Sequence, residues 1–180
     1  MKRCRWVNLN NPIYVKYHDK EWGIESHDDR YLFEMLLLES FQAGLSWECI
    51  LNKRENFRSS FDNFHYEKIS KYDDQKINEL INNKGIVRNK LKIKAAINNA
   101  KIFIDIQKEY GTFDTYIWSF TNNKVIESHD SFITHSNLSD TISNDLKRRG
   151  MKFVGTTIIY SYLQAIGIIN DHDYACYLID

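Results

Sequence analysis

The 180-residue sequence has little proline and glycine, few cysteines, and no excess of charge of either sign. It contains one proline, seven glycines and three cysteines, and 24 basic side chains balance 24 acidic ones. So little proline and glycine fits a compact helical protein better than a β-sandwich. An odd number of widely separated cysteines argues against a disulfide framework and leaves free thiols or metal ligands. Because the net charge is zero, any surface that binds a polyanion must be a local patch.

The sequence also lacks an apolar run long enough to span a bilayer, and no charged-then-apolar leader follows Met1. We therefore expect a cytoplasmic protein without a membrane partner. The length suits a single domain over residues 1–180, and 43% hydrophobic residues are ample for its core. We expect this domain to be a monomer.

Helical periodicity dominates the chain, and no pair of strands is predicted. Apolar spacing predicts a buried helix that ends near Gln42, after a capping segment at 26–29. Helical stretches are also predicted at 46–61, 66–82 (with a helix start at Asp73), 89–110, 113–120, 139–149 and 156–166, and a polar loop at 121–137. The sequence thus predicts an all-α fold.

The stretch 38–47 brings polar and aromatic groups to the end of the predicted buried helix. Glu39 and Gln42 lie three residues apart, so they share one face of a helix. Gly44 breaks the helix at a tight bend, and Trp47 follows. A carboxylate, an amide and a large aromatic side chain could together hold a flat heterocycle. The alternative is a core helix that ends in a glycine cap, with Glu39 solvated.

Aromatic residues are concentrated near both this stretch and the N-terminus. Tyr14, Tyr17, Trp22 and Trp47 could surround Glu39. Such a cluster is most often part of a core. A base flipped out of DNA, however, requires an aromatic face to stack on and a polar group at its edge.

Cysteine and histidine occur as pairs near the two ends of the chain. Cys4 and His18 lie near one end, and His172 and Cys176 near the other. The second pair has i, i+4 spacing, which on a helix directs both side chains to one face. Two cysteines and two histidines form a closed tetrahedral zinc site. From spacing alone, a zinc clasp between the termini and four ordinary core or surface residues are equally consistent.

The segment 147–157 contains two glycines and four basic residues between two predicted helices. It could form a helix-hairpin-helix turn whose backbone N–H groups and following helix N-terminus bind a phosphate. Its basic side chains would add salt-sensitive attraction. The alternative is an ordinary αα-hairpin with a cationic helix end.

Short motifs occurring in one order along the chain closely resemble the 3-methyladenine DNA glycosylase I family (TAG) of the helix-hairpin-helix DNA glycosylase superfamily. They are Cys4-x-Trp6, Tyr14-x2-Tyr17-His18-Asp19-x-Glu21-Trp22-Gly23, Leu38-Glu39-x2-Gln42-Ala43-Gly44-Leu45-Ser46-Trp47, Lys53-Arg54-Glu55-Asn56-Phe57, Gly85-Ile86-Val87-Arg88, Trp118-Ser119-Phe120, Lys152-Phe153-Val154-Gly155-Thr156-Thr157 and Asn170-Asp171-His172-x3-Cys176.

This resemblance implies an all-α helix-hairpin-helix glycosylase fold, with the hairpin at about 146–160. It implies base-excision repair: hydrolysis of the N-glycosidic bond of 3-methyladenine in alkylated double-stranded DNA, which releases the free base and leaves an abasic site. It also implies one structural zinc ion, held by Cys4, His18, His172 and Cys176, that joins the terminal segments 1–27 and 168–180.

The resemblance further implies roles for particular residues. Glu39 is the predicted catalytic residue and hydrogen-bonds the excised base, while Trp47 stacks on it. Gly44 and Leu45 would sit at the gap left by the extruded nucleotide. The remaining predicted base-binding residues are Trp6, Tyr14, Tyr17, Trp22 and Gln42, and the predicted DNA-binding residues of the hairpin are Lys152, Phe153, Val154, Gly155 and Thr156.

The sequence departs from the family at three places outside the predicted pocket. Ile24-Glu25 lacks the usual proline, Leu91 replaces a usual glycine, and the tail after Cys176 is short. Asp171 follows the hairpin, and we expect it to support the metal site or cap a chain end. Two alternatives remain at this stage: a non-catalytic zinc-containing helix-hairpin-helix module that binds DNA, and a glycosylase for another alkylated base.

Overall fold

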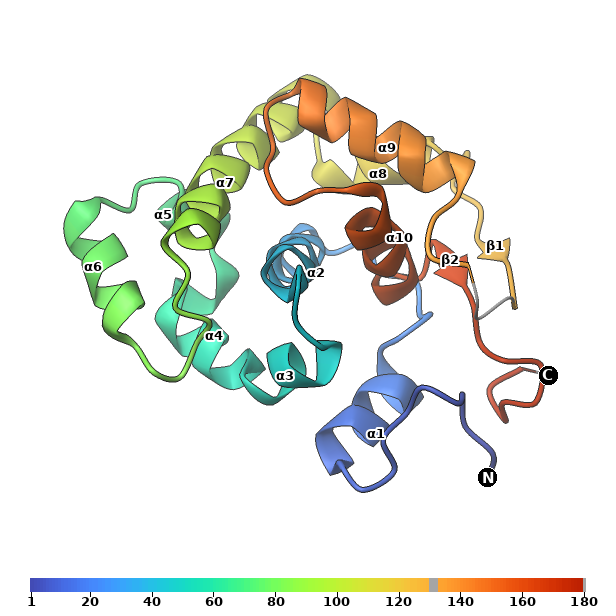
Figure 1. Cartoon of the computed structure of the whole chain (residues 1–180). Coiled ribbons are helices and arrows are strands. Elements are labelled where there is room, and N and C mark those ends of the chain that lie inside the picture. Colours follow the sequence, from blue (N-terminus) through green and yellow to red (C-terminus); the bar gives the residue numbers. More distant parts are fainter. Residues whose placement is uncertain (130–132, 180) are drawn as a thin grey trace.

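The computed structural model describes residues 1–129 and 133–179 and is mostly helical, as the sequence predicts (Figure 1). Among the described residues, none of the helices combines the length and apolar character needed to cross a bilayer. The helices are α1 (Pro12–Lys20), α2 (Asp29–Gln42), α3 (Trp47–Asn52), α4 (Arg54–Ser60), the 3-10 turn η1 (Asp62–Phe64), α5 (Tyr66–Ile69), α6 (Asp74–Asn82), α7 (Lys90–Tyr110), α8 (Phe113–Ser119), α9 (Asn137–Arg148) and α10 (Thr156–Ala165).

Helix α2 lies at the centre of the molecule and contacts α3, α7 and α10 (Figure 1). Asp28 caps its start by accepting a hydrogen bond from the Tyr31 N–H at 2.8 Å. Every residue from 32 to 41 is buried. A helix enclosed on all sides needs no polar face. As a result, α2 carries the Glu39 carboxyl into the interior.

Some predicted boundaries differ from the structure. The predicted helix 46–61 is broken at Lys53 into α3 and α4. The stretch 66–82 forms α5 and α6, and α6 begins after its N-cap Asp73, so the helix start predicted there is confirmed. Helix α9 starts at Asn137 with Ser136 as its N-cap, in a reciprocal capping box with Ser139. Helix α9 therefore begins two residues before the predicted stretch 139–149, because Ser139 occupies the N3 position of that box.

The structure also contains one pair of strands, which the sequence analysis did not predict. Strands β1 (Ile126–Glu127) and β2 (Ile169–Asn170) pair in parallel, with Ile126 opposite Ile169. Strands of two residues are too short to show an alternating pattern. The pair attaches part of the predicted loop 121–137 to the C-terminal segment. Residues 130–132 of that loop lie outside the described residues.

Helices α9 and α10 are joined by the predicted hairpin, which packs against α7 (Figure 1). The Asn99 amide of α7 donates to the Lys152 carbonyl and accepts from the Lys152 N–H, both at 2.9 Å. Asn98 donates to the Gly150 carbonyl at 2.9 Å, and Ser143 to the Val154 carbonyl at 2.7 Å. Side chains from two helices thus fix the hairpin backbone.

Candidate functional site

All seven predicted base-binding residues line one cavity of about 230 Å³. This volume is below the usual range for drug-sized ligands, roughly 300–1,000 Å³, and suits a smaller molecule such as one heterocyclic base. The predicted residues that line it are Trp6, Tyr14, Tyr17, Trp22, Glu39, Gln42 and Trp47. They come from the N-terminal segment, α1, α2 and α3, so the pocket forms where these elements meet.

Glu39 is the buried acid of this pocket. It lies one turn before the end of α2, and only 3% of its surface is exposed. Burial raises the pKa of its carboxyl to about 8, because the ionised form loses its hydration. The free pocket therefore holds mostly the neutral acid at pH 7. A cationic ligand would favour the carboxylate instead.

Aromatic rings form the walls around Glu39. Tyr17 and Trp47 have ring centroids 5.4 Å apart, and Trp6 lies 5.3 Å from Tyr14 and 4.8 Å from Trp22. Burial raises the pKa of Tyr14 to about 12 and that of Tyr17 well above its usual value. Both phenols therefore stay neutral and keep their O–H donors at physiological pH.

Two buried polar atoms of the pocket residues have no hydrogen-bond partner within the described ranges. They are the Trp47 indole N–H and Asp171 Oδ1. Buried polar groups are nearly always paired. An unpaired donor and an unpaired acceptor around one cavity indicate that a polar ligand or water completes the site.

Asp171 lies against α10. Its Oδ2 accepts hydrogen bonds from the Tyr160 hydroxyl at 3.2 Å and from the Gln164 amide at 2.7 Å. These bonds orient the Asp171 carboxylate toward the pocket wall. The sequence analysis expected a supporting role at the metal site or a capping role, and neither of these two bonds connects Asp171 to the metal-site residues.

The turn after α2 exposes one apolar side chain beside the pocket. The Gln42 amide donates to the Leu45 carbonyl at 2.9 Å, and the Leu45 N–H donates to the Gln42 carbonyl at 2.7 Å. Gly44 has φ +80°, a conformation that favours glycine. Leu45 is 39% exposed. The turn is therefore held rigidly while its leucine points outward.

A buried lysine ties the end of α2 to α7. Lys92 Nζ donates to the carbonyl oxygens of Phe41, at 2.8 Å, and of Ala43. Its ammonium group also lies 5.8 Å from the centre of the Phe153 ring in the hairpin. Burial lowers the pKa of Lys92. The last carbonyls of a helix carry partial negative charge and favour a cation here.

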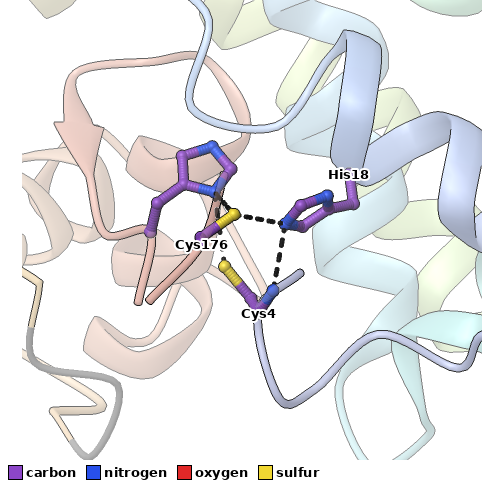
Figure 2. A group of neighbouring side chains, drawn as sticks. Cys4, His18 and Cys176 are labelled. Atoms are coloured by element: carbon purple, nitrogen blue, oxygen red, sulfur yellow. Dashed lines mark hydrogen bonds between the residues drawn. The ribbon is translucent and has the colours of Figure 1, made fainter. Parts of the chain in front are cut away.

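The two cysteine–histidine pairs meet in one buried cluster, in which all four ligand atoms lie within 4.8 Å of one another. Cys4 Sγ lies 3.3 Å from His172 Nδ1, and Cys176 Sγ lies 3.5 Å from His18 Nε2 and 3.6 Å from His172 Nδ1. Figure 2 shows Cys4, His18 and Cys176 converging on one point. Zinc bonds of ~2.3 Å to sulfur and ~2.0 Å to nitrogen place tetrahedral ligand atoms about 3.5 Å apart.

The chemistry of the four ligands fits a metal ion. Burial raises the pKa of Cys4 to about 12 and lowers the pKa of His172 to about 4. Thiolates form in such surroundings only beside a cation. Asp19 Oδ1 lies 2.8 Å from His18 Nδ1, and Arg3 donates one hydrogen bond to each oxygen of the Asp19 carboxylate. A carboxylate that orients a ligating histidine is a common outer support of metal sites.

The two C-terminal ligands lie in a turn. The segment from His172 to Cys176 forms turns, and its i, i+4 pair converges without a helix. The Cys176 N–H donates to the Asp173 carbonyl at 2.7 Å. The turn brings both ligands to the same side. The cluster joins the N- and C-terminal segments, as predicted.

The hairpin residues differ in what they expose. Lys152 is exposed, whereas the Val154 side chain is 1% exposed and can offer only its backbone. Gly155 is the N-cap of α10, and open space lies around its Cα. The Thr156 hydroxyl lies 2.8 Å from the Ser139 hydroxyl. The start of α10 thus presents free backbone N–H groups with no side-chain cap.

Seven residues that the sequence analysis did not assign to base binding also line the pocket. Four of them lie on one face of α10, with the i, i+3, i+4, i+7 spacing of a helix face. This polar stripe in an otherwise apolar helix was the signal that could have identified them. The seven are Ile133, Thr134, Thr157, Tyr160, Ser161, Gln164 and Asp171.

Comparison with known proteins gives concordant matches. The family model for methyladenine glycosylase matches residues 6–179. The DNA-3-methyladenine glycosylase 1 of Escherichia coli (strain K12) is 41% identical over 180 residues, covering 98% of this chain and 96% of the relative. A crystal structure of 3-methyladenine DNA glycosylase I (TAG) superimposes with a TM-score of 0.94 at 41% identity, covering 98% of this chain and 99% of that chain.

A second solved structure holds a ligand. It is a tyrosine-to-phenylalanine variant of 3-methyladenine DNA glycosylase I in complex with 3-methyladenine, with a TM-score of 0.93 and 34% identity, covering 98% of this chain and 97% of that chain. These matches cover nearly the whole of both chains. The chain therefore belongs to the methyladenine glycosylase family.

Proposed function

We propose that this chain excises 3-methyladenine from alkylated double-stranded DNA, with Glu39 as the residue that recognises the base. The observation that carries the proposal is the buried Glu39 carboxyl, with a raised pKa, inside an aromatic cavity of about 230 Å³. A related structure holds 3-methyladenine itself. The reaction hydrolyses the N-glycosidic bond, releases the free base and leaves an abasic site.

Methylation at N3 makes adenine cationic and hence a good leaving group. The C1′–N9 bond breaks with its electron pair passing to the ring, which neutralises the positive charge. Water adds its oxygen to C1′ and gives up one proton. The protein then needs to extrude the nucleotide, hold the departing base and admit water, so base recognition carries most of the selectivity.

Glu39 would distinguish the methylated base from adenine by charge. Entry of the cationic base favours ionisation of a carboxyl whose pKa is about 8 in the free pocket. A hydrogen bond to a charged group contributes about 1.5–3 kcal/mol, or roughly one to two powers of ten in affinity. Neutral adenine gains no such contribution. Its slower intrinsic departure adds further discrimination.

The aromatic side chains supply the remaining contacts. Trp47 stacks on the base, and its unpaired indole N–H is available to the ligand or to water. Tyr14 and Tyr17 stay neutral and can donate their O–H groups. Trp6, Trp22 and Gln42 complete the wall.

DNA would be held by two segments beside the pocket. The hairpin residues Lys152 to Thr156 offer a cation and free backbone N–H groups to phosphates. Gly44 and the protruding Leu45 would fill the gap left by the extruded nucleotide. The base pocket, the turn at Gly44 and Leu45, and the hairpin would then all contact the DNA strand that carries the methylated base.

The metal is proposed to be a single structural zinc ion on Cys4, His18, His172 and Cys176. Two thiolates and two imidazoles suit zinc, and four protein ligands leave no open position for water. Zinc would join the terminal segments, which carry Trp6 and Trp22 of the pocket. The continuous core supports treating residues 1–180 as a single domain.

A non-catalytic DNA-binding module would need the hairpin and the metal site but no base pocket. The convergence of Glu39, Gln42 and Trp47 on one cavity favours the enzyme.

Release of free base from methylated duplex DNA tests the proposal, with products separated by chromatography. We expect the protein to release 3-methyladenine and to leave 7-methylguanine in place. The Glu39→Gln variant should release 3-methyladenine roughly 10- to 100-fold more slowly, and the exposed Glu79→Gln variant serves as the matched control. A folded, metal-loaded protein that releases no base would favour the non-catalytic module.

A further inference from the structure

Positive charge is unevenly distributed in this electrically neutral chain. Between residues 80 and 104 there are six basic residues and no acidic one. This stretch covers the loop before α7 and more than half of α7 itself. The hairpin that packs against α7 is also basic. The two elements together form the local patch that a neutral protein requires to bind a polyanion.

The lysines at the start of α7 disfavour the helix that carries them. Lys90 and Lys94 are a like-charged i, i+4 pair, which destabilises a helix by roughly 0.2–0.5 kcal/mol. Cations near a helix N-terminus also oppose its dipole. Lys92 has partners in the α2 carbonyls. Within residues 1–129 and 133–179, no such structural partner accounts for Lys90 or Lys94.

The exposed cations of this region have no ion pair. Across residues 1–129 and 133–179, Lys90, Lys94 and Lys152 form no salt bridge. By contrast, Arg148 and Arg149, on the other side of the hairpin, are paired with acidic residues. Three cations without a salt bridge thus lie near the place where α7 meets the hairpin.

A groove of about 510 Å³ lies beside Lys94 and Lys152, and we call it the α7 groove; Lys90 lies one turn before Lys94 at the start of α7. The groove is lined by Leu91, Lys94, Ala95, Asn98, Lys152 and Phe153. Leu91 is 71% exposed and, with Ala95 and Phe153, gives the groove apolar surface. The groove therefore has an apolar floor and a cationic rim, and Lys152 belongs both to the rim and to the hairpin.

We infer that the α7 groove is a second DNA-contact surface, which holds the sugar–phosphate backbone of duplex DNA next to the extruded nucleotide. The inference rests on the proposed function. Lys90, Lys94 and Lys152 bind phosphates, and Leu91 and Phe153 contact deoxyribose faces. Continuity with the hairpin favours DNA over a protein partner, because Asn98 and Asn99 fix the groove and the hairpin backbone in one rigid unit.

The test measures equilibrium binding to a duplex that contains a non-hydrolysable abasic-site analogue, as a function of salt concentration. The variants are Lys90→Gln and Lys94→Gln. The control is Lys108→Gln, near the far end of α7, where Lys108 is paired with Asp105. Each groove variant should lower the slope of log K against log salt by about 0.9, and thus weaken binding about eightfold at 0.1 M salt. The control should keep the wild-type slope.

Two further measurements separate the outcomes. Melting temperature and the affinity for free 3-methyladenine should stay at wild-type values in both groove variants, because neither residue lines the base pocket. Unchanged salt slopes in an active enzyme would overturn the inference alone. A change of oligomeric state, seen by ultracentrifugation without loss of DNA affinity, would assign the groove to a second copy and also overturn it. Failure of the wild-type protein to release base would instead contradict the proposed function.

Discussion

Glu39 shows how one side chain can serve recognition at a cost to stability. Its carboxyl lies in the interior because α2 is enclosed on all sides, and burial raises its pKa from 4.5 to about 8. A raised folded-state pKa gives stability that is complete below about pH 4.5 and is lost as the pH rises toward 8. With its pocket empty, the protein is therefore least stable at high pH, where the Glu39 carboxyl is ionised and can bind a cation.

We predict that Glu39→Gln gains stability relative to wild type as the pH increases. The difference should grow by about 1.4 kcal/mol per pH unit between pH 5 and 8, and reach a few kcal/mol. Denaturant unfolding at pH 5, 6.5 and 8 measures it. The exposed Glu79→Gln variant should show no such trend, and parallel pH profiles for Glu39→Gln and wild type would contradict the burial argument.

At the residue scale, motifs identified the charged and aromatic members of the pocket. The seven base-binding residues named from the sequence line one cavity. The polar face of α10 was missed because Thr157, Tyr160 and Ser161 are also common in packed helices. Asp171 was named, but its bonds to Tyr160 and Gln164 depend on a tertiary contact that spacing does not reveal.

At the scale of elements, tight turns place the functional segments. Gly44 and Gly167 both have positive φ, +80° and +79°. A Cβ at Gly44 would meet open space, whereas a Cβ at Gly167 would lie 2.3 Å from the Glu25 nitrogen. The two glycines share a backbone conformation and differ in their surroundings.

We predict that Gly44→Ala costs about 1 kcal/mol of stability, from the left-handed backbone alone. Gly167→Ala should cost several times more, because the added Cβ would overlap the backbone of Ile24 and Glu25, which would have to move. Chemical denaturation of both variants provides the comparison. Equal losses would show that the close approach at Gly167 is relieved without cost.

Element types were largely predictable, and their ends were less so. The break at Lys53 and the turn from His172 to Cys176 lie inside patterns that also suit a helix. The β1–β2 pair links segments more than 40 residues apart through two residues each, and local sequence contains no signal of that pairing.

At the scale of the whole molecule, the cluster of Cys4, His18, His172 and Cys176 joins the two ends of the chain. Figure 1 shows both termini on the same side, near α1. The His172 ring lies 4.6 Å from the Trp22 ring, so the cluster supports the pocket wall directly. Residue types suggested this cluster, and only the folded structure shows that the four ligand atoms meet.

Removal of one metal ligand should therefore affect both stability and the pocket. We predict that Cys176→Ser abolishes stoichiometric zinc binding, lowers the melting temperature by about 10 °C and weakens binding of free base. Metal analysis and calorimetry measure these effects. Cys49→Ser, which changes a cysteine outside the cluster, is the control and should retain zinc. Full zinc content in Cys176→Ser would contradict the assignment.

The most direct test of the account is the preference of the pocket for a cationic over a neutral adenine, measured by titrating 3,9-dimethyladeninium, which keeps the positive charge of the base in DNA, and neutral 9-methyladenine while following tryptophan fluorescence. The wild-type protein should bind the cation roughly 10- to 100-fold more tightly than the neutral base, and Glu39→Gln should lose most of that preference while keeping its fold. An unchanged preference in Glu39→Gln would contradict the claim that the buried acid reads the methylated base.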